Sequence, residues 1–125
     1  SNRSEVETLK SKQGYKKYRI LVEVSGDVSL DEVNGALSRL EGAVIHQRTP
    51  QRVAHRRADK VRDRRVVHID LVHSKDGRFL IDVVGEAGLY IKELVSGDNG
   101  RTHPSLAELL GCEAHVVDLD VVLVE

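Results

Sequence analysis

Short runs rich in β-branched residues, separated by turn residues, limit this chain to a small layered domain built around a sheet. Such runs occupy residues 18–24, 43–47, 65–72, 78–84 and 114–124, and their length and composition are typical of β-strands. The segment 73–77 carries a Lys-Asp-Gly turn between two of the runs and predicts an antiparallel hairpin. Apolar runs such as Val121 to Val124 are far shorter than the ~20 residues that cross a bilayer, so we expect no membrane span.

Capping signals predict helices between these strands. Ser29 and Glu32 form a capping box ahead of leucines and valines at helical spacing, and Gly42 follows as the stop signal. Ser105 and Glu108 repeat this pattern, and a short helix is predicted over residues 91–95. The order of elements favours an α+β fold with a mixed, largely antiparallel sheet and short helices on one side.

The length of 125 residues suits one domain, or one piece of a larger one. The chain opens Ser1-Asn2-Arg3 without a methionine, which we interpret as a tag remnant joined to an internal segment. We therefore assign residues 1–17 to a tag remnant and a polar lead, and residues 18–125 to the folded domain. A single Cys112 excludes an internal disulfide framework, so we expect a reducing, cytoplasmic location.

The near-neutral total charge of -1 conceals a strongly basic segment. Between His46 and His68 there are eight Arg and Lys residues and two Asp residues, a net charge of +6 in a chain whose remainder carries -7. A solvated loop is the usual explanation for a short charge run, but this density exceeds what solubility requires and favours contact with a polyanion. Aromatic residues make up only 3% of the chain, too few for the stacking platforms of single-strand RNA binders.

Motifs of nucleotide-binding enzymes and of serine hydrolases are absent from the sequence. Cys112, His115 and His103 are conceivable metal ligands, but their spacing matches no known site and structural or incidental roles are favoured. We expect no metal site. The remaining unusual stretch is 88–105, in which an aromatic residue, a lysine and a Gly-Asp-Asn-Gly-Arg-Thr loop lie between apolar elements. Such a segment can form a site, with a plain capped loop as the alternative.

Two long motifs carry a resemblance to a known family. The first is Gln47-Arg48-Thr49-Pro50 with Arg52-Val53, followed by His55-Arg56-Arg57-Ala58-Asp59 and Val61-Arg62. The second runs from Gly88-Leu89-Tyr90-Ile91-Lys92-Glu93 through Ser96-Gly97-Asp98 and Gly100-Arg101-Thr102 to Pro104-Ser105. Together they resemble the archaeal and eukaryotic tRNA pseudouridine synthases that modify adjacent uridines of the T loop. The second block and Ala114-His115-Val116 with Leu119 also resemble the TruB synthases, and the likeness extends over residues 18–124.

The resemblance implies an isomerase without a cofactor that acts on the tRNA T arm. It implies supporting catalytic roles for Lys92, which pairs with the catalytic aspartate, and for Tyr90 and Leu119, which line the uracil pocket. The RNA-binding residues that it implies, together with the basic segment, are Arg48, Arg52, His55, Arg56, Arg57, Lys60, Arg62, Arg64 and Arg101.

The sequence departs from the family at two points. The catalytic aspartate motif lies N-terminal to everything present here, so we expect the missing N-terminal part of the enzyme to supply it and this chain alone to be inactive. The family's stacking tyrosine would fall near Val66-Val67-His68, where no tyrosine occurs. Either His68 substitutes or the register differs there.

Two other hypotheses stay open. The chain could be a non-catalytic RNA-binding module with the same fold, or an α+β interaction domain whose basic loop meets an acidic protein.

Overall fold

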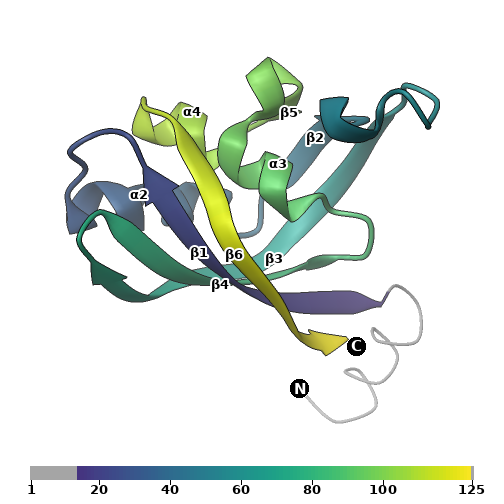
Figure 1. Cartoon of the computed structure of the whole chain (residues 1–125). Helices are drawn as coiled ribbons and strands as arrows, with labels where there is room; N and C mark the ends of the chain where they lie inside the picture. The colour runs from purple at the N-terminus through teal and green to yellow at the C-terminus, as the bar shows by residue number, and fades with distance from the viewer. Residues whose placement is uncertain (1–13, 125) are drawn as a thin grey trace, which may run out of the picture.

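The computed structural model describes residues 14–124, which form a six-stranded sheet with three short helices against one face (Figure 1). The strands are β1 (Tyr15–Val24), β2 (Val44–Arg48), β3 (Val61–Lys75), β4 (Arg78–Glu86), β5 (Thr102–His103) and β6 (Ala114–Val124). The helices are α2 (Leu30–Leu40), α3 (Ile91–Ser96) and α4 (Leu106–Leu110), with 3-10 turns η1 (Gln51–Val53) and η2 (Asp98–Gly100). The expected α+β class is confirmed. Residues 1–13 of the expected tag remnant and lead lie outside the described part, and β1 begins at Tyr15 rather than at Tyr18.

All strand pairs are antiparallel, in the order β5-β2-β3-β4-β1-β6. The expected hairpin is present but tighter than the sequence suggested. Lys75 pairs with Arg78, so the turn consists of Asp76 and Gly77, with φ values of 53° and 76°. Positive φ at both positions gives the turn a twist that matches the flanking strands, and this lets β3 and β4 extend to its edge.

The predicted caps are present at α2 and α4. Ser29 Oγ accepts from the Glu32 amide at 3.1 Å, and the Glu32 carboxylate accepts from the Ser29 amide at 2.9 Å. Ser105 Oγ likewise accepts from the Glu108 amide at 3.1 Å. The predicted box at α4 is only half formed, because the Glu108 carboxylate lies 2.8 Å from His103 Nδ1 instead of binding the Ser105 amide. These local hydrogen bonds are encoded by residues three positions apart, which is why the sequence located both helix starts.

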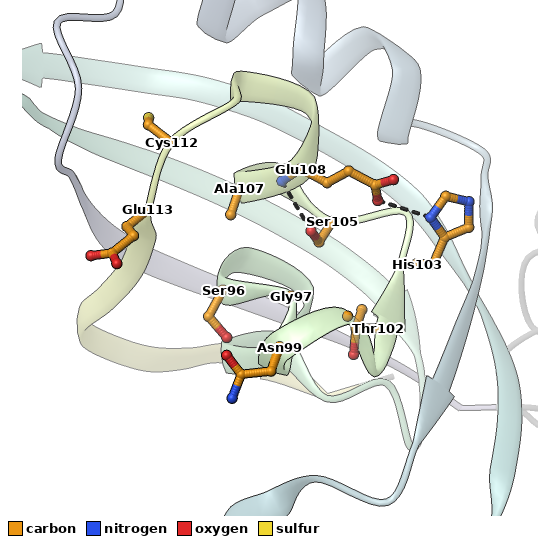
Figure 2. Close-up of a pocket in the computed structure, with 11 residues that line it drawn as sticks. Ser96, Gly97, Asn99, Thr102, His103, Ser105, Ala107, Glu108, Cys112 and Glu113 are labelled. Carbon is orange, nitrogen blue, oxygen red and sulfur yellow. Dashed lines mark hydrogen bonds and ion pairs between the residues drawn. The ribbon is translucent and has the colours of Figure 1, made fainter.

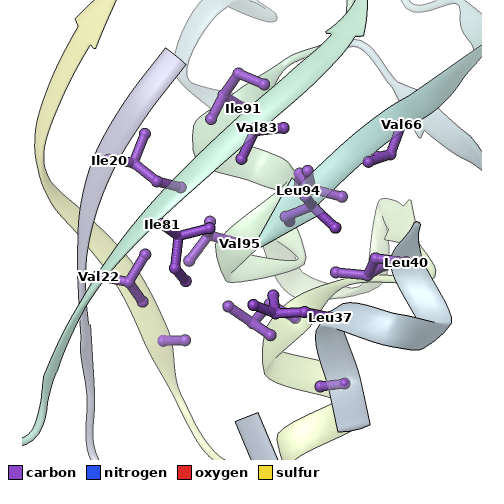
Figure 3. Close-up of a cluster of buried hydrophobic side chains, with 14 of the residues drawn as sticks. Ile20, Val22, Leu37, Leu40, Val66, Ile81, Val83, Ile91, Leu94 and Val95 are labelled. Carbon is purple, nitrogen blue, oxygen red and sulfur yellow. The ribbon is translucent and has the colours of Figure 1, made fainter. Parts of the chain in front are cut away.

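A single apolar core lies between the sheet and the three helices (Figure 3). Ile20 and Val22 of β1 and Ile81 and Val83 of β4 supply its sheet side, and all four are fully buried. The helices contribute leucines and valines from their inward faces, namely Val33, Leu37, Leu40, Leu94, Val95 and Leu106. Within residues 14–124 no helix has the length and apolar character needed to span a membrane.

Strand β6 does not keep the strict alternation predicted for it. Its register against β1 shifts, so that Val116 pairs with Val22 and Leu119 with Ile20 while Val117 has no opposite residue. Val117 was expected on the face of Leu119, but the extra residue reverses the alternation and leaves it 39% exposed. Leu119 does pack against the core, as predicted.

The sheet carries an ion pair between an exposed arginine and a buried carboxylate. Arg19 donates to Asp82 through two hydrogen bonds of 2.7 and 2.9 Å, and Lys17 lies 3.9 Å from the same carboxylate. Asp82 is only 8% exposed. The hydrogen bonds and positive charge of Arg19 lower the pKa of Asp82 below its ordinary value.

This pair predicts a loss of stability in acid. A carboxylate whose folded-state pKa is depressed stabilises the fold above its unfolded value of about 3.9, and this contribution disappears as the pH falls through the lower folded-state value. Asp82→Asn should therefore lower the free energy of unfolding at pH 7 and flatten its decline below about pH 4. Urea titrations at several pH values test this. Asp27→Asn, at an exposed loop carboxylate, is the control, and an unchanged acid profile in Asp82→Asn would contradict the assignment.

Candidate functional site

The two sequence motifs lie together in the structure although some forty residues separate their anchoring groups in the chain. The first forms a hairpin from β2, the loop 49–60 and the start of β3. The second forms the turn 88–90, α3, η2 and β5, and β5 pairs with β2. In Figure 1 the loop that carries η1 extends beyond the sheet on the same side as α3. The segment that was expected to be an irregular basic loop is therefore partly strand, since β3 begins at Val61, four residues before the predicted start at Arg65, and includes Arg62 and Arg64.

Gln47 joins the hairpin to the turn before α3. It occupies an inward position of β2 and is 0% exposed. Its amide nitrogen donates to the Tyr90 carbonyl at 2.9 Å, and its amide oxygen accepts from the Tyr90 amide at 2.9 Å. The same nitrogen also donates to Thr102 Oγ1 at 3.4 Å. All the polar groups of a fully buried side chain are thus used, and two of the three bonds fix the backbone of one residue.

An ion pair with a buried carboxylate joins the same two segments further along both motifs. Arg52 of η1 donates to the Glu93 carboxylate at 2.8 Å, with a second bond of 3.4 Å. Glu93 is 5% exposed, so its charge is removed from water, whereas half of the Arg52 side chain remains accessible. The hydrogen bond to Glu93 raises the pKa of Arg52 above its ordinary value. The arginine is therefore held in place by the residue next to Lys92.

The Tyr90 ring lies beneath two guanidinium groups. The Arg62 guanidinium carbon is 5.0 Å from the ring centroid and that of Arg52 is 6.0 Å away. Arginines at these distances are attracted to the ring face. Gly88 has φ of 96°, a conformation that favours glycine, and its lack of a side chain lets the turn pass close to the Arg64 side chain.

Asp59 closes the base of the basic loop by binding two arginines. Arg48 and Arg101 both donate to its carboxylate, the latter at 3.0 Å. Arg101 also donates to the Thr49 carbonyl at 2.7 Å. The hydrogen bond from Arg48, aided by the charge of Arg101, lowers the pKa of Asp59. This carboxylate therefore stays ionised and joins Arg48 of the first motif to Arg101 of the second.

The residues expected to bind RNA fall into two groups. Arg48, Arg52 and Arg101 are ion-paired within the protein, Arg64 donates to the Ala87 carbonyl at 2.9 Å, and Arg62 covers Tyr90. Four exposed side chains of the loop have no ion-pair or side-chain hydrogen-bond partner within residues 14–124, namely His55, Arg56 and Arg57 near its tip and Lys60 at its base beside β3. The first group shapes the surface and the second presents charge to solvent.

Lys92 and Leu119 lie on adjacent elements, since α3 packs against β6. Lys92 is exposed on the first turn of α3, and no carboxylate within residues 14–124 pairs with it. Tyr90 caps the same helix and is half-buried. The three residues to which the resemblance assigned supporting catalytic roles are thus on α3, its cap and the neighbouring strand, with a lysine charge available to an outside carboxylate.

His68 lies elsewhere. Its Nδ1 is 2.8 Å from Glu41 and its Nε2 is 3.3 Å from Asp70, and the side chain is exposed at the end of α2. These ion pairs tie the ring to α2 and to its own strand, and none of them reaches Tyr90 or Lys92.

Gln47, Glu93 and Asp59 were not identified as functional candidates from the sequence. Gln47 did leave a signal, because it is polar at the position where the alternation of β2 demands an apolar residue. Glu93 and Asp59 have no comparable signal, because their partners are distant in the chain.

The three side chains considered as metal ligands each have a different environment. His103 lies 2.8 Å from Glu108, His115 lies 3.3 Å from Glu23, and Cys112 adjoins Gly26. No cluster of three His, Cys, Asp or Glu side chains suited to a metal occurs in residues 14–124. His103 and Cys112 do help to line a hollow of about 570 Å³ beyond the C-terminal end of α3, whose lining includes neither Tyr90 nor Lys92 (Figure 2).

Comparison with known families and proteins matches the whole chain. The model of the family described as "Pus10, C-terminal" matches residues 1–125. A "tRNA pseudouridine synthase Pus10" of Methanothrix thermoacetophila is 52% identical over 122 residues, which are 97% of this chain and 26% of that protein. Its counterpart in Aeropyrum pernix is 56% identical over 112 residues, 88% of this chain and 25% of that protein. The chain therefore spans about a quarter of the length of these relatives.

Solved structures give a consistent result. A chain in the crystal structure of a Cbf5-Nop10-Gar1 complex superposes with a TM-score of 0.71 and 32% identity, covering 88% of this chain and 30% of that one. A chain in an H/ACA RNP bound to a substrate RNA containing 2'-deoxyuridine gives a TM-score of 0.62 and 27% identity, covering 87% of this chain and 28% of that one.

The Arg52–Glu93 pair predicts an asymmetric mutational response. Arg52→Ala leaves a buried carboxylate without its partner and should lower the free energy of unfolding by about 1–3 kcal/mol. Adding Glu93→Gln removes the stranded charge and should recover part of this loss. Urea denaturation of the two variants tests it, with Arg56→Ala as the matched control, which at an exposed arginine should change stability by no more than about 0.5 kcal/mol. Equal losses in Arg52→Ala and Arg56→Ala would contradict the pairing.

Proposed function

Because this chain belongs to the Pus10 C-terminal family, we propose that it is the C-terminal part of a tRNA pseudouridine synthase, where it anchors RNA and completes the uracil pocket. The observation that carries the proposal is the convergence of the two motifs at Tyr90, with Lys92 exposed beside it. Its proposed substrate is a uridine of the tRNA T arm. The remainder of the longer protein supplies the catalytic aspartate.

In this proposal each residue acts through its position. The enzyme cleaves the glycosidic bond of a uridine, rotates the base and rejoins it through carbon. Lys92 pairs with the incoming aspartate and keeps that carboxylate ionised, because a nearby positive charge favours its charged form. Tyr90 and Leu119 form the wall against which the extruded base lies. This role requires that the Lys92 side chain has no ion-pair partner of its own, and within residues 14–124 it has none.

The basic loop is the proposed RNA anchor. Flipping a base out of its stack costs a few kcal/mol of free energy. Contacts between the protein and the surrounding RNA must compensate for this cost. Arg56 and Arg57 are exposed near the loop tip and Lys60 is exposed at its base, and Arg guanidinium groups suit phosphates. Arg48, Arg52 and Arg101 keep the loop at a fixed place relative to α3.

A non-catalytic RNA-binding module with the same fold is the second candidate. The basic loop is consistent with this module, but the module does not explain the exposed position of Lys92. The synthase and the module predict different effects of Lys92. In the module a lysine on α3 could only add to RNA affinity, whereas in the enzyme it acts on the rate of the chemical step.

Phosphate contact at the loop tip predicts a strong dependence of tRNA binding on salt. If about five phosphates are neutralised, log K should fall against log salt with a slope of about -3.5 to -4.5. The double variant Arg56→Ala/Arg57→Ala should make this slope shallower by the contribution of about two phosphate contacts. Arg78→Ala is the control. Arg78 begins β4 and pairs with Lys75, at the end of β3 that is remote from the basic loop. Filter binding at several salt concentrations measures the slope, and salt-independent affinity would refute the anchor.

The role of Lys92 is tested in the full-length enzyme. Lys92→Ala should lower the single-turnover rate of pseudouridine formation by roughly 100-fold or more, because the ionised state of the aspartate is lost, while tRNA affinity falls by about one phosphate contact. The 125-residue chain alone should convert no uridine. A normal rate with weakened binding would favour the RNA-binding role for Lys92, and activity of the chain alone would place the nucleophile within it.

A further inference from the structure

Hydrogen bonds from distant side chains hold the residues on both sides of Lys92, whereas the Lys92 side chain itself is exposed. On the N-terminal side, the Tyr90 amide and carbonyl are both bonded to the Gln47 side chain at 2.9 Å. On the C-terminal side, Glu93 is bonded to Arg52 at 2.8 Å. Lys92 is exposed between these two anchors. Its placement is therefore decided by its neighbours' contacts and not by its own.

We infer that Gln47 is a positioning residue for the proposed reaction, whose amide sets the backbone of Tyr90 and through it the place of Lys92 and the Tyr90 ring. The inference rests on the proposed function for the meaning of Lys92 and Tyr90, and on the structure alone for the contacts. Nothing in Gln47 itself reaches the surface, since its side chain is fully buried. It therefore acts only through Tyr90 and Thr102.

The geometry of the contact accounts for the choice of a glutamine. A primary amide presents one acceptor and two donors. Gln47 uses the acceptor on the Tyr90 amide and its nitrogen on the Tyr90 carbonyl, as a neighbouring β-strand would. The Tyr90 carbonyl also accepts from the Leu94 amide at 3.0 Å, the first hydrogen bond of α3. The glutamine thus holds the residue at which α3 begins, and it aligns the helix that presents Lys92.

Rate rather than affinity should report this role. Displacement of a reacting group by about 1 Å can cost about 100-fold in rate even when the binding surface is intact. The base of the basic loop is held separately through Asp59, Thr49 and Arg101. Loss of the Gln47 bonds should consequently move Lys92 and Tyr90 without removing the phosphate anchors.

Two substitutions at Gln47 separate positioning from simple burial. Gln47→Met fills a similar volume but makes none of the three hydrogen bonds. Gln47→Glu keeps the shape, and its neutral acid form can accept from the Tyr90 amide and donate to the Tyr90 carbonyl, whereas its charged form can only accept. Burial disfavours the charged form and so raises the pKa of the introduced carboxyl group. The population of its neutral acid form should therefore increase as the pH falls from 8 to 6.

The experiment measures single-turnover pseudouridine formation at saturating tRNA by full-length enzyme, together with tRNA affinity and the thermal midpoint. Gln47→Met should slow the reaction by about 10- to 100-fold at every pH while the dissociation constant changes less than about 3-fold. Gln47→Glu should be slow at pH 8, and its rate relative to wild type should rise at least about 5-fold by pH 6. The control is Ile45→Val, a substitution two positions earlier in β2 at a fully buried core residue, which lowers stability without touching Tyr90.

The outcomes separate the two proposals. If the wild-type enzyme forms no pseudouridine, the proposed function fails and the positioning test does not begin. If the wild type is active but Gln47→Met retains its single-turnover rate below its thermal midpoint, Gln47 only fills the core and the inference is overturned. A rate in Gln47→Glu that is independent of pH relative to wild type also overturns it. Should Gln47→Met fail to fold, the pH dependence of Gln47→Glu still decides the matter.

Discussion

The buried amide of Gln47 and the buried carboxylate of Glu93 hold the rest of the site in place. Each is a polar group removed from water, so each must be satisfied within the protein, and each finds its partner on the opposite motif. Because an unsatisfied group of this kind is costly, the hairpin and α3 can occupy only the relative position that satisfies both. The apolar core brings these elements together, and the polar contacts decide how they are aligned.

This constraint explains why a strongly basic segment contains so few free charges. Arg48 and Arg101 share Asp59, Arg52 is paired with Glu93, and Arg62 lies over Tyr90. Such paired arginines form the framework of the loop. The charge of this segment that remains available to a polyanion is concentrated in the loop before β3, in Arg56, Arg57 and Lys60. A net charge counted along the sequence therefore overstates the charge that a partner meets, and it does not show where that charge lies.

Much of the fold could be predicted because its signals are local. The capping pairs at Ser29 and Ser105 located two helices, and the Lys-Asp-Gly turn located the hairpin of β3 and β4. The predictions failed where pairing between distant strands overrides local pattern. The extra residue in β6 shifted Val117 away from the face of Leu119, and pairing with β2 drew Arg62 and Arg64 into β3. Register is a property of two strands, so one strand's sequence does not specify it.

The class of the fold, the two motifs and the residues worth testing could be read from the amino-acid sequence, since residue type, spacing and capping patterns are local features of the chain. Which of those residues are free to act depends on how the chain folds. Lys92 and Arg56 look no different in sequence from Arg52 and Arg101, yet the first two face solvent and the others are held by Glu93 and Asp59. Whether a charge is available depends on which opposite charge the folded chain brings within about 3 Å of it, and residues far apart in sequence meet only when the sheet and the core place them together.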